Sequence, residues 1–205
     1  WEYVTFSEPL ACVCNSVKKA KIDLGDDVVV IGGGIMGLLH VAVAKLSGAK
    51  VILSEIDPKR RAIAEELGAD ITFNPLEKDP VEFVKSLTEG RGADVVFDTT
   101  AIASVASQGI EMTGPMGRFI MYSSVKPDDP VALSADKLHS TEKVITGTVS
   151  PSIQSFDTAV RLLNKGLVNP EKLIYGVYGL DKINQAFEDA IRPDTFRVII
   201  DFRED

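Results

Sequence analysis

The sequence predicts an α/β fold in which helices cover both faces of a six-stranded parallel sheet. Short runs rich in β-branched residues alternate with segments of helical spacing, which is typical of βαβ units. The runs are apolar throughout, as expected for strands that are buried on both faces of a parallel sheet. The expected strands are Asp27–Ile31, Val51–Ser54, Ile71–Phe73, Asp94–Asp98, Arg118–Tyr122 and Val144–Gly147.

The helices between these strands have recognisable starts and ends. Asp57 and Asp79 each precede a proline, so the aspartate can cap a helix whose first turn holds the proline. The first of these helices is expected to end near Leu67-Gly68, because glycine favours the left-handed conformation that follows many helices. Another helix is expected over Ile35–Leu46, directly after the first strand.

Both ends of the chain fall outside this pattern, which predicts three parts: residues 1–15, the doubly wound domain over 16–148, and residues 149–205. The last part is expected to contain a helix from Ser150-Pro151 to about Lys165, a strand over Leu173–Tyr178, a helix over Leu180–Ile191 and a strand over Phe196–Phe202. The chain begins at Trp1 within sequence typical of a folded region. We therefore expect it to be cut from a longer polypeptide.

Composition and charge exclude several classes of protein. Of 205 residues, 45% are hydrophobic, which is enough for a substantial core. The 30 acidic and 22 basic residues give a net charge of −8, which argues against nucleic-acid or anionic-membrane partners. No apolar run is long enough to span a bilayer and no signal peptide is recognisable. Two cysteines, Cys12 and Cys14, cannot form a disulfide framework or a multi-cysteine zinc site, so a reducing, cytoplasmic compartment fits best.

The first strand runs directly into Gly32-Gly33-Gly34-Ile35-Met36-Gly37, which contains the pattern G-x-G-x-x-G. Gly32 would allow a tight turn, Gly34 would let a pyrophosphate approach the backbone, and Gly37 would let the helix pack against the sheet. The helix that begins at Ile35 and Met36 offers free N–H groups to an anion. With a strand before it and a helix after it, the pattern predicts a dinucleotide-binding Rossmann domain. Gly33 is interpreted as filler.

An acidic residue after the second strand supports the same interpretation. Glu55 stands where a carboxylate can accept hydrogen bonds from both hydroxyls of the adenine ribose, and it would repel the 2′-phosphate of NADP. Arg60 could reach the same ribose or be a solvated charge, and the run Lys59-Arg60-Arg61 leaves some room for a phosphate. The sequence therefore favours NAD. S-adenosylmethionine is the alternative ligand for such a loop, but the strand rhythm and the glycine spacing favour the dinucleotide.

The chain resembles the zinc-dependent medium-chain dehydrogenases, in particular the branch of sorbitol and threonine dehydrogenases. The resemblance covers nearly the whole chain. It rests on the segments Glu8-Pro9-Leu10, Lys18–Gly25, Gly32–Gly37, Ser54–Asp57, Glu66–Asp70, Gly92–Asp98 and Gly117–Ser123. It implies a catalytic, GroES-like domain whose two parts flank the coenzyme domain, so residues 1–15 and 149–205 would belong to that second domain.

The resemblance also implies roles for individual residues. Glu8 matches a glutamate beside the catalytic zinc, where it would bind the metal directly or through water. The other residues that it implies as coenzyme contacts are Thr99, Thr100, Ser123, Thr148 and Arg197, the last aimed at the pyrophosphate. The family's remaining zinc ligands have no counterpart here. His40 is expected to pack in the core and His139 to lie in a loop, so the chain alone is expected to hold no zinc tightly and to be inactive.

These observations predict the coenzyme-binding part of an NAD-linked, zinc-dependent dehydrogenase that oxidises a small-molecule alcohol, a polyol or a hydroxy amino acid. The alternatives are a zinc-free, NADPH-dependent quinone or enoyl reductase of the same superfamily, a stand-alone NAD-sensing module and a methyltransferase. The resemblance further implies a homodimer or homotetramer, in which Val144–Gly147 could form the paired edge strand.

Overall fold

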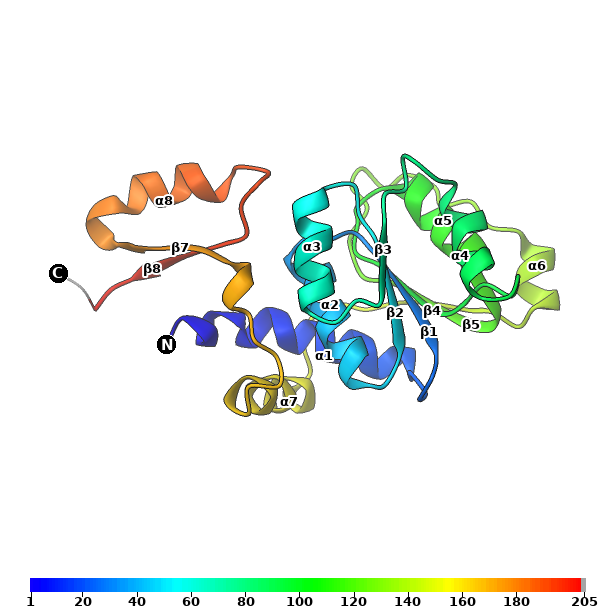
Figure 1. Cartoon of the computed structure of the whole chain (residues 1–205), viewed down its shortest axis with the longest axis horizontal. Coiled ribbons are helices and arrows are strands. Elements are labelled where there is room, and N and C mark those ends of the chain that lie inside the picture. The colour runs from blue at the N-terminus through cyan, green and yellow to red at the C-terminus, as the bar shows by residue number, and fades with distance from the viewer. Residues whose placement is uncertain (204–205) are drawn as a thin grey trace.

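The structure is a computed structural model, and it describes residues 1–203. Its main feature is a six-stranded parallel sheet with strand order β3-β2-β1-β4-β5-β6 (Figure 1). The strands are β1 (Asp27–Ile31), β2 (Lys50–Ser54), β3 (Ile71–Phe73), β4 (Ala93–Asp98), β5 (Thr113–Met121) and β6 (Val144–Gly147). The predicted doubly wound fold is confirmed. The order reverses at β1, so the carboxyl ends of β1 and β4 flank the position where such sheets bind ligands.

Helices cover both faces of the sheet, because successive side chains of a strand point to opposite faces. The helices are α1 (Ser7–Ala20), α2 (Ile35–Leu46), α3 (Pro58–Glu66), α4 (Pro80–Leu87), α5 (Ala103–Met112), α6 (Ala135–Ser140), α7 (Ile153–Asn164) and α8 (Ile183–Ala190). Val28 and Val30 belong to a core cluster that includes residues of α1, α2 and α7. Val29 and Ile31 belong to a second cluster that includes residues of α4 and α5. Within residues 1–203, none of them is long and apolar enough to cross a membrane.

The helix starts predicted at two aspartates are confirmed. Asp57 accepts a hydrogen bond from the N–H of Lys59 at 2.7 Å, and Pro58 is the first residue of α3. Asp79 accepts a hydrogen bond from the N–H of Glu82 at 3.0 Å at the start of α4. These caps supply partners for N–H groups that the helix itself cannot satisfy.

Two elements differ from the prediction. β5 begins at Thr113, which pairs with Ala93, and not at Arg118. The intervening glycines and proline are typical of a turn, but here they accompany a shift of register between β4 and β5 and lie within the strand. His139, which the sequence predicts in a loop, lies on the short helix α6.

The N-terminal helix α1 is continuous across residues 15 and 16, where the sequence predicts a domain boundary. A 3₁₀ helix, η1 (Glu2–Phe6), precedes it. α1 packs against α2 and against α7, which lies in the predicted C-terminal part. All three helices share one core cluster, although the division into 1–15, 16–148 and 149–205 stays a prediction.

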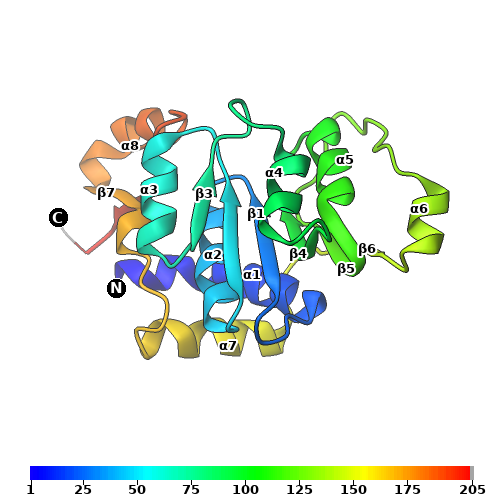
Figure 2. The same ribbon diagram turned by 45° about the vertical axis from the view of Figure 1, so that its right-hand side comes forward.

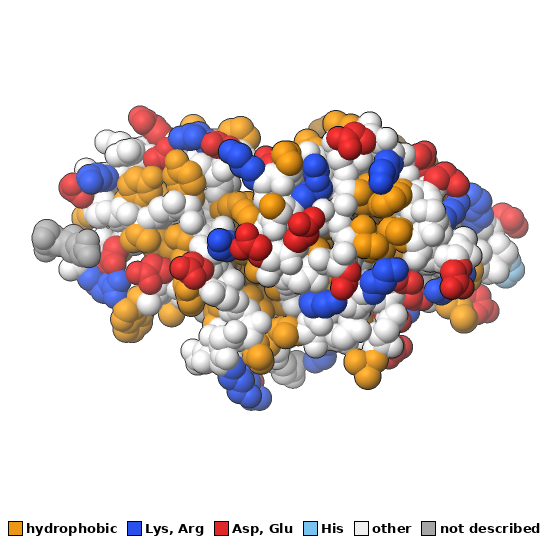
Figure 3. All heavy atoms as spheres, in the orientation of Figure 1, with side chains coloured by type: hydrophobic (Ala, Val, Ile, Leu, Met, Phe, Trp, Pro, Cys, Tyr) orange, Lys and Arg blue, Asp and Glu red, His pale blue; other side chains and the backbone are white. Residues whose placement is uncertain are grey.

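The C-terminal residues form a small strand–helix–strand unit at one end of the molecule, as predicted (Figures 1 and 2). β7 (Ile174–Gly179) and β8 (Arg197–Asp201) pair in parallel, and α8 packs on both strands. Two further 3₁₀ turns, η2 (Glu171–Leu173) and η3 (Leu180–Lys182), flank β7. Figure 3 shows hydrophobic side chains over this end among interspersed charges, and Phe187 and Ile191 are exposed.

His40 on α2 is a buried packing residue, as the sequence predicts. Its side chain is fully buried, and Nδ1 lies 2.7 Å from the carbonyl oxygen of Met36. A carbonyl oxygen can only accept, so Nδ1 carries the proton and Nε2 accepts from the hydroxyl of Ser16 at 3.0 Å. Burial lowers the pKa of His40 to about 4 from its usual 6.5.

This burial predicts a loss of stability in acid. The unfolded chain binds a proton at His40 below pH 6.5 and the folded chain only near pH 4, so stability decreases as the pH falls through this window. We expect the contribution of His40 to decrease by about 3 kcal/mol. Urea unfolding of wild type and His40→Leu at pH 7 and pH 4 measures it. A difference between the two proteins that does not change with pH contradicts the prediction.

Candidate functional site

The glycine segment forms the turn between the end of β1 and the start of α2. Gly32 has a φ of +96°, in the left-handed region that glycine adopts without strain. Gly34 is extended and directly precedes α2. The N–H groups of Ile35 and Met36 lie in the first turn of α2, where the helix has no carbonyl partners for them and its dipole is positive. This arrangement is suited to binding a phosphate group.

Close contacts require glycine at position 37, in the first turn of α2, whereas Gly34 leaves open space next to the backbone. A Cβ atom at Gly37 would lie 1.9 Å from the carbonyl oxygen of Gly32. Any residue other than glycine at position 37 would therefore push α2 away from the turn. A Cβ atom at Gly34 would meet no atom within 4 Å. The backbone at Gly34 is therefore open to a ligand, as a pyrophosphate cradle requires.

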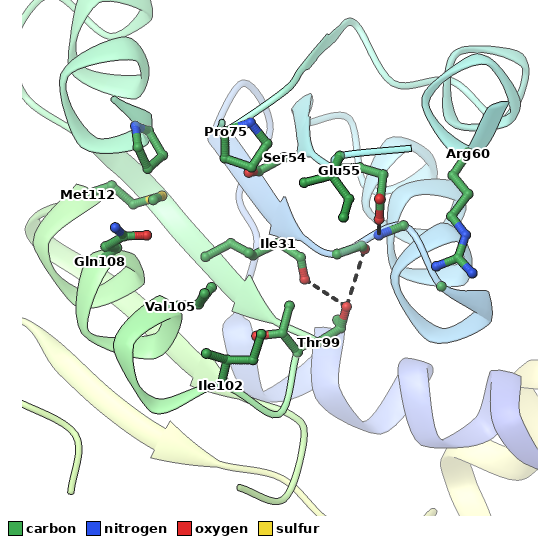
Figure 4. A pocket seen from close by; sticks show the side chains of 16 residues that line it. Ile31, Ser54, Glu55, Arg60, Pro75, Thr99, Ile102, Val105, Gln108 and Met112 are labelled. Carbon is green, nitrogen blue, oxygen red and sulfur yellow. Dashed lines mark hydrogen bonds between the residues drawn. The ribbon is translucent and has the colours of Figure 1, made fainter. Parts of the chain in front are cut away.

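Gly33 is not filler, and that interpretation of the sequence was wrong. Its N–H donates a hydrogen bond to the carboxylate oxygen Oε2 of Glu55 (Figure 4). A Cβ atom at Gly33 would lie 2.8 Å from both Cγ and Oε2 of that side chain. A side chain at this position would force the Glu55 carboxylate to move, because the glutamate folds directly over the turn.

Glu55 follows β2, and its carboxylate is turned inward over the glycine turn. The residue is only 7% exposed. Its second oxygen, Oε1, accepts a hydrogen bond from the N–H of Asp57 at 2.8 Å, and its own N–H donates to the carbonyl oxygen of Phe73 at 3.0 Å. Both carboxylate oxygens therefore have backbone donors, which stabilises a charge at a buried position.

The basic run after Glu55 is divided between two structural contacts. Arg61 donates through Nη1 to two backbone carbonyl oxygens, each at 2.8 Å. Arg60 lines the cleft, but its Nη2 donates to the carbonyl oxygen of Pro193 at 2.5 Å, in the segment before β8. The guanidinium of Arg61 is thus hydrogen-bonded to nearby backbone carbonyls, and Arg60 links the cleft with the C-terminal unit.

The glycine turn, Glu55 and Arg60 border a cleft of about 370 Å³ at the carboxyl ends of β1, β2 and β4. Figure 4 shows Val105 and Met112 on the side of this cleft away from Arg60. The apolar residues of the lining are Ile31, Ile56, Pro75, Pro80, Ile102, Val105 and Met112. An apolar slot with a few polar groups is typical of a small-molecule site. Sequence reasoning missed this apolar lining because its members come from separate elements and form no motif.

Thr99 and Thr100 follow β4 and line the same cleft. The hydroxyl of Thr99 donates to the carbonyl oxygen of Ile31 at 2.7 Å and lies 3.3 Å from that of Gly32. The hydroxyl of Thr100 donates to Oδ1 of Asp98 at 2.7 Å. The hydroxyl protons of both threonines are therefore donated to partners within the protein. Asp98 itself is fully buried, its Oδ2 has no partner among residues 1–203, and burial raises the pKa of its carboxyl group.

A second cavity, of about 400 Å³, lies at the carboxyl ends of β5 and β6. Ser123 and Thr148, two of the predicted coenzyme contacts, line it together with Cys12 and Tyr122. The predicted coenzyme residues that follow the strands are thus divided between two cavities at the same edge of the sheet, whereas Ile35, Met36 and Gly37 are not among the lining residues of either.

A family model described as zinc-binding dehydrogenase matches residues 36–165. The chain belongs to this family. It is 34% identical over 189 residues to L-threonine 3-dehydrogenase of Pyrococcus abyssi, and the alignment covers 91% of this chain and 54% of the relative. It is 31% identical over 196 residues to sorbitol dehydrogenase of Halalkalibacterium halodurans, and that alignment covers 95% of this chain and 57% of the relative. The resemblance to the sorbitol and threonine branch is confirmed, and the chain spans little more than half of these relatives.

Solved structures of the family have the same fold. A zinc-binding dehydrogenase of Sinorhizobium meliloti 1021, described as bound to NADP, superposes with a TM-score of 0.88 at 27% identity. The match covers 95% of this chain and 58% of that structure. Alcohol dehydrogenase of Thermus sp. ATN1 superposes with a TM-score of 0.86 at 27% identity, covering 96% and 59%.

In this zinc-binding dehydrogenase chain, Glu8 lies exposed in the first turn of α1. Its Oε1 accepts a hydrogen bond from the thiol of Cys12 at 3.2 Å. Burial is the main cause that raises the pKa of Cys12 to about 11, and Glu8 adds to it. Cys14 points into the core instead, as expected for two cysteines on different faces of one helix. Residues 1–203 contain no cluster of three or more His, Cys, Asp or Glu side chains that could hold a metal.

Arg197, at the start of β8, is not among the residues that line either of these two cavities. Its guanidinium carbon lies 5.2 Å from the centre of the Phe6 ring. Burial lowers the pKa of Arg197, and the negative charge of Glu8 acts in the opposite direction. Its predicted contact with the pyrophosphate stays a prediction.

The two glycines predict different outcomes for substitution. Gly34→Ala meets no atom in the protein, so we expect about 1 kcal/mol or less of lost stability but at least a tenfold loss of NADH affinity, because the methyl group fills the cradle. Gly37→Ala forces α2 away from the turn and is expected to destabilise the fold by several kcal/mol. Thermal unfolding and fluorescence titration with NADH measure both effects. Wild-type affinity in Gly34→Ala contradicts the assignment of the cradle.

Proposed function

We propose that this chain is the NAD-binding portion of a zinc-dependent dehydrogenase that oxidises a secondary alcohol, a polyol or a hydroxy amino acid. The observation that carries the proposal is the pairing of an open backbone at Gly34, before α2, with the inward carboxylate of Glu55. The names of the relatives, which include sorbitol and L-threonine 3-dehydrogenases, support the substrate class.

The residues of the first cleft fit a dinucleotide from its adenine end to its pyrophosphate. The apolar lining would take the adenine, Glu55 would accept hydrogen bonds from the ribose hydroxyls, and Ile35 and Met36 would donate to the pyrophosphate. The second cavity, with Ser123 and Thr148, would take the nicotinamide end. The coenzyme supplies the hydride acceptor, and the protein supplies binding and orientation.

We infer a preference for NAD over NADP from the charges near the ribose position. The carboxylate of Glu55 would repel a 2′-phosphate, and Arg61 is held by backbone carbonyls at 2.8 Å and is not free to neutralise it. Arg60 lines the cleft, but its contact with Pro193 would have to break before it could bind a phosphate there. The relative described as bound to NADP makes that coenzyme the competing outcome.

Direct titration tests the preference. We expect NADH to bind at least tenfold more tightly than NADPH, and Glu55→Gln to reduce this ratio by about tenfold because the repulsive charge is removed. Glu82→Gln, an exposed change on α4, is the matched control and should keep the wild-type ratio. Calorimetric titration of the three proteins with both nucleotides measures the ratios. Tighter binding of NADPH by the wild type would reverse the assignment.

Zinc would activate the alcohol as a Lewis acid in the intact enzyme. Glu8 can supply one carboxylate ligand, directly or through water, and the other ligands would come from outside residues 1–203, which hold no metal cluster. The residues of this chain therefore fit the edge of a zinc site, and we assign them no catalytic step through the metal. On this proposal the chain alone binds coenzyme but does not oxidise alcohols.

Metal analysis separates this proposal from a self-contained zinc enzyme. After gel filtration we expect the 205-residue chain to retain well below one equivalent of zinc and to show no turnover of sorbitol or L-threonine with NAD, since a single carboxylate holds zinc weakly. A protein that also carries the missing ligands should hold zinc, and its Glu8→Gln variant should hold less. One tightly held equivalent in the 205-residue chain would refute the expectation.

The assembly of the intact enzyme is part of the same proposal. β6 is one of the two outer strands of the sheet, and Val144 at its start is half exposed. A second copy could extend the sheet across this edge, which would give a homodimer or, through further contacts, a homotetramer. We place the enzyme in the cytoplasm, in keeping with its two free cysteines.

A further inference from the structure

The peptide unit between Ile31 and Gly32 makes hydrogen bonds on both sides, with β2 and with the segment that follows β4. The carbonyl oxygen of Ile31 accepts hydrogen bonds from the N–H of Thr99, at 3.0 Å, and from its hydroxyl, at 2.7 Å. The N–H of Gly32, at the other end of this unit, donates to the carbonyl oxygen of Ser54 at 2.9 Å. The segment after β4 therefore holds one end of the unit, and β2 holds the other.

The next peptide unit, between Gly32 and Gly33, is held in the same way. The carbonyl oxygen of Gly32 lies 3.3 Å from the hydroxyl of Thr99, and the N–H of Gly33 donates to the carboxylate of Glu55. In a trans peptide the C=O and N–H groups point in opposite directions. Partners on both sides therefore fix the rotation of the plane, and with it the direction of the backbone that leads to Gly34.

The hydroxyl of Thr99 also fills the space that two glycines leave. Cβ atoms at Gly32 and Gly37 would lie 2.9 Å and 3.0 Å from its oxygen. Figure 4 shows this hydroxyl between the end of β1 and the turn, with its contacts to the backbone of residues 31 and 32. The side chain thus packs against the turn and the start of α2 at once.

We propose that Thr99 is a positioning residue that, together with Glu55, orients the glycine turn for the pyrophosphate of the coenzyme. This inference rests on the proposed coenzyme function. A hydroxyl group has one proton, and here it is donated to the backbone carbonyls of the turn. A pyrophosphate offers only acceptors, so Thr99 could donate to it only by releasing the turn. Thr99 therefore acts through the loop, which differs from the direct coenzyme contact that the family resemblance implies.

The decisive variants are Thr99→Val, which removes the hydroxyl at nearly constant volume, and Thr99→Ser, which keeps it. Thr113→Val is the matched control, because the hydroxyl of Thr113 also donates to a backbone carbonyl oxygen, that of Gly109 at 2.8 Å, and Thr113 lies at the start of β5, at the opposite edge of the sheet. Each protein is titrated with ADP-ribose, NADH and adenosine. Amide hydrogen exchange at Gly32 and Gly33 is measured by NMR without ligand.

We expect Thr99→Val to bind ADP-ribose and NADH about five- to tenfold more weakly, the effect of one lost hydrogen bond, and adenosine within about twofold of wild type. Thr99→Ser and Thr113→Val should keep the wild-type affinities. Exchange at Gly33 should accelerate in Thr99→Val and not in Thr113→Val. If the loss of any threonine hydroxyl weakened binding by destabilising the fold, adenosine binding would decrease as well, and Thr113→Val would show the same decrease.

Several outcomes would overturn the proposal. Wild-type affinity of Thr99→Val for ADP-ribose, an equal loss for adenosine and ADP-ribose, or unchanged exchange at Gly33 would each refute the role of Thr99 while leaving the proposed function intact. If the wild-type chain binds neither ADP-ribose nor NADH, the proposed function fails, and the inference for Thr99 fails with it.

Discussion

The close approach of α2 to the turn that ends β1 is the constraint on which the site depends. At Gly37 the helix lies so near the carbonyl oxygen of Gly32 that a Cβ atom would overlap it at 1.9 Å. This contact brings the first turn of α2 to the carboxyl edge of the sheet, directly after Gly34, which lines the cleft. The last residue of β2, Glu55 after it, and the segment after β4 all contribute hydrogen-bond partners to the same turn.

The sequence was sufficient for the features that depend on local chemistry. Apolar strand runs, aspartate caps such as Asp57, and glycines at fixed spacing each act within a few residues, so β1, α2 and the start of α3 could be predicted closely. The start of β5 could not, because its pairing with Ala93 persists through residues whose local preference is for a turn. Local preference was overridden there by the sheet.

The parts of the site that sequence reasoning missed are long-range contacts. The bond from Gly33 to Glu55 joins residues 22 apart, and the bond from Thr99 to Ile31 joins residues 68 apart. The same limit applies to the basic run, where Arg61 binds nearby carbonyls but Arg60 reaches Pro193, 133 residues away. Motifs predicted the elements that meet at the site, whereas the partners of each side chain follow only from the fold.

The packing of α2 also links the proposed coenzyme cleft with Glu8. Ser16 on α1 donates to His40 on α2, and the ring of His40 lies 4.7 Å from that of Tyr122, which lines the second cavity. These contacts lie in a close-packed core, so a shift of α2 at the glycine turn would displace α1 as well. Since α1 carries Glu8 in its first turn, a buried hydrogen bond between two helices fixes the position of the proposed zinc ligand relative to the proposed coenzyme cleft.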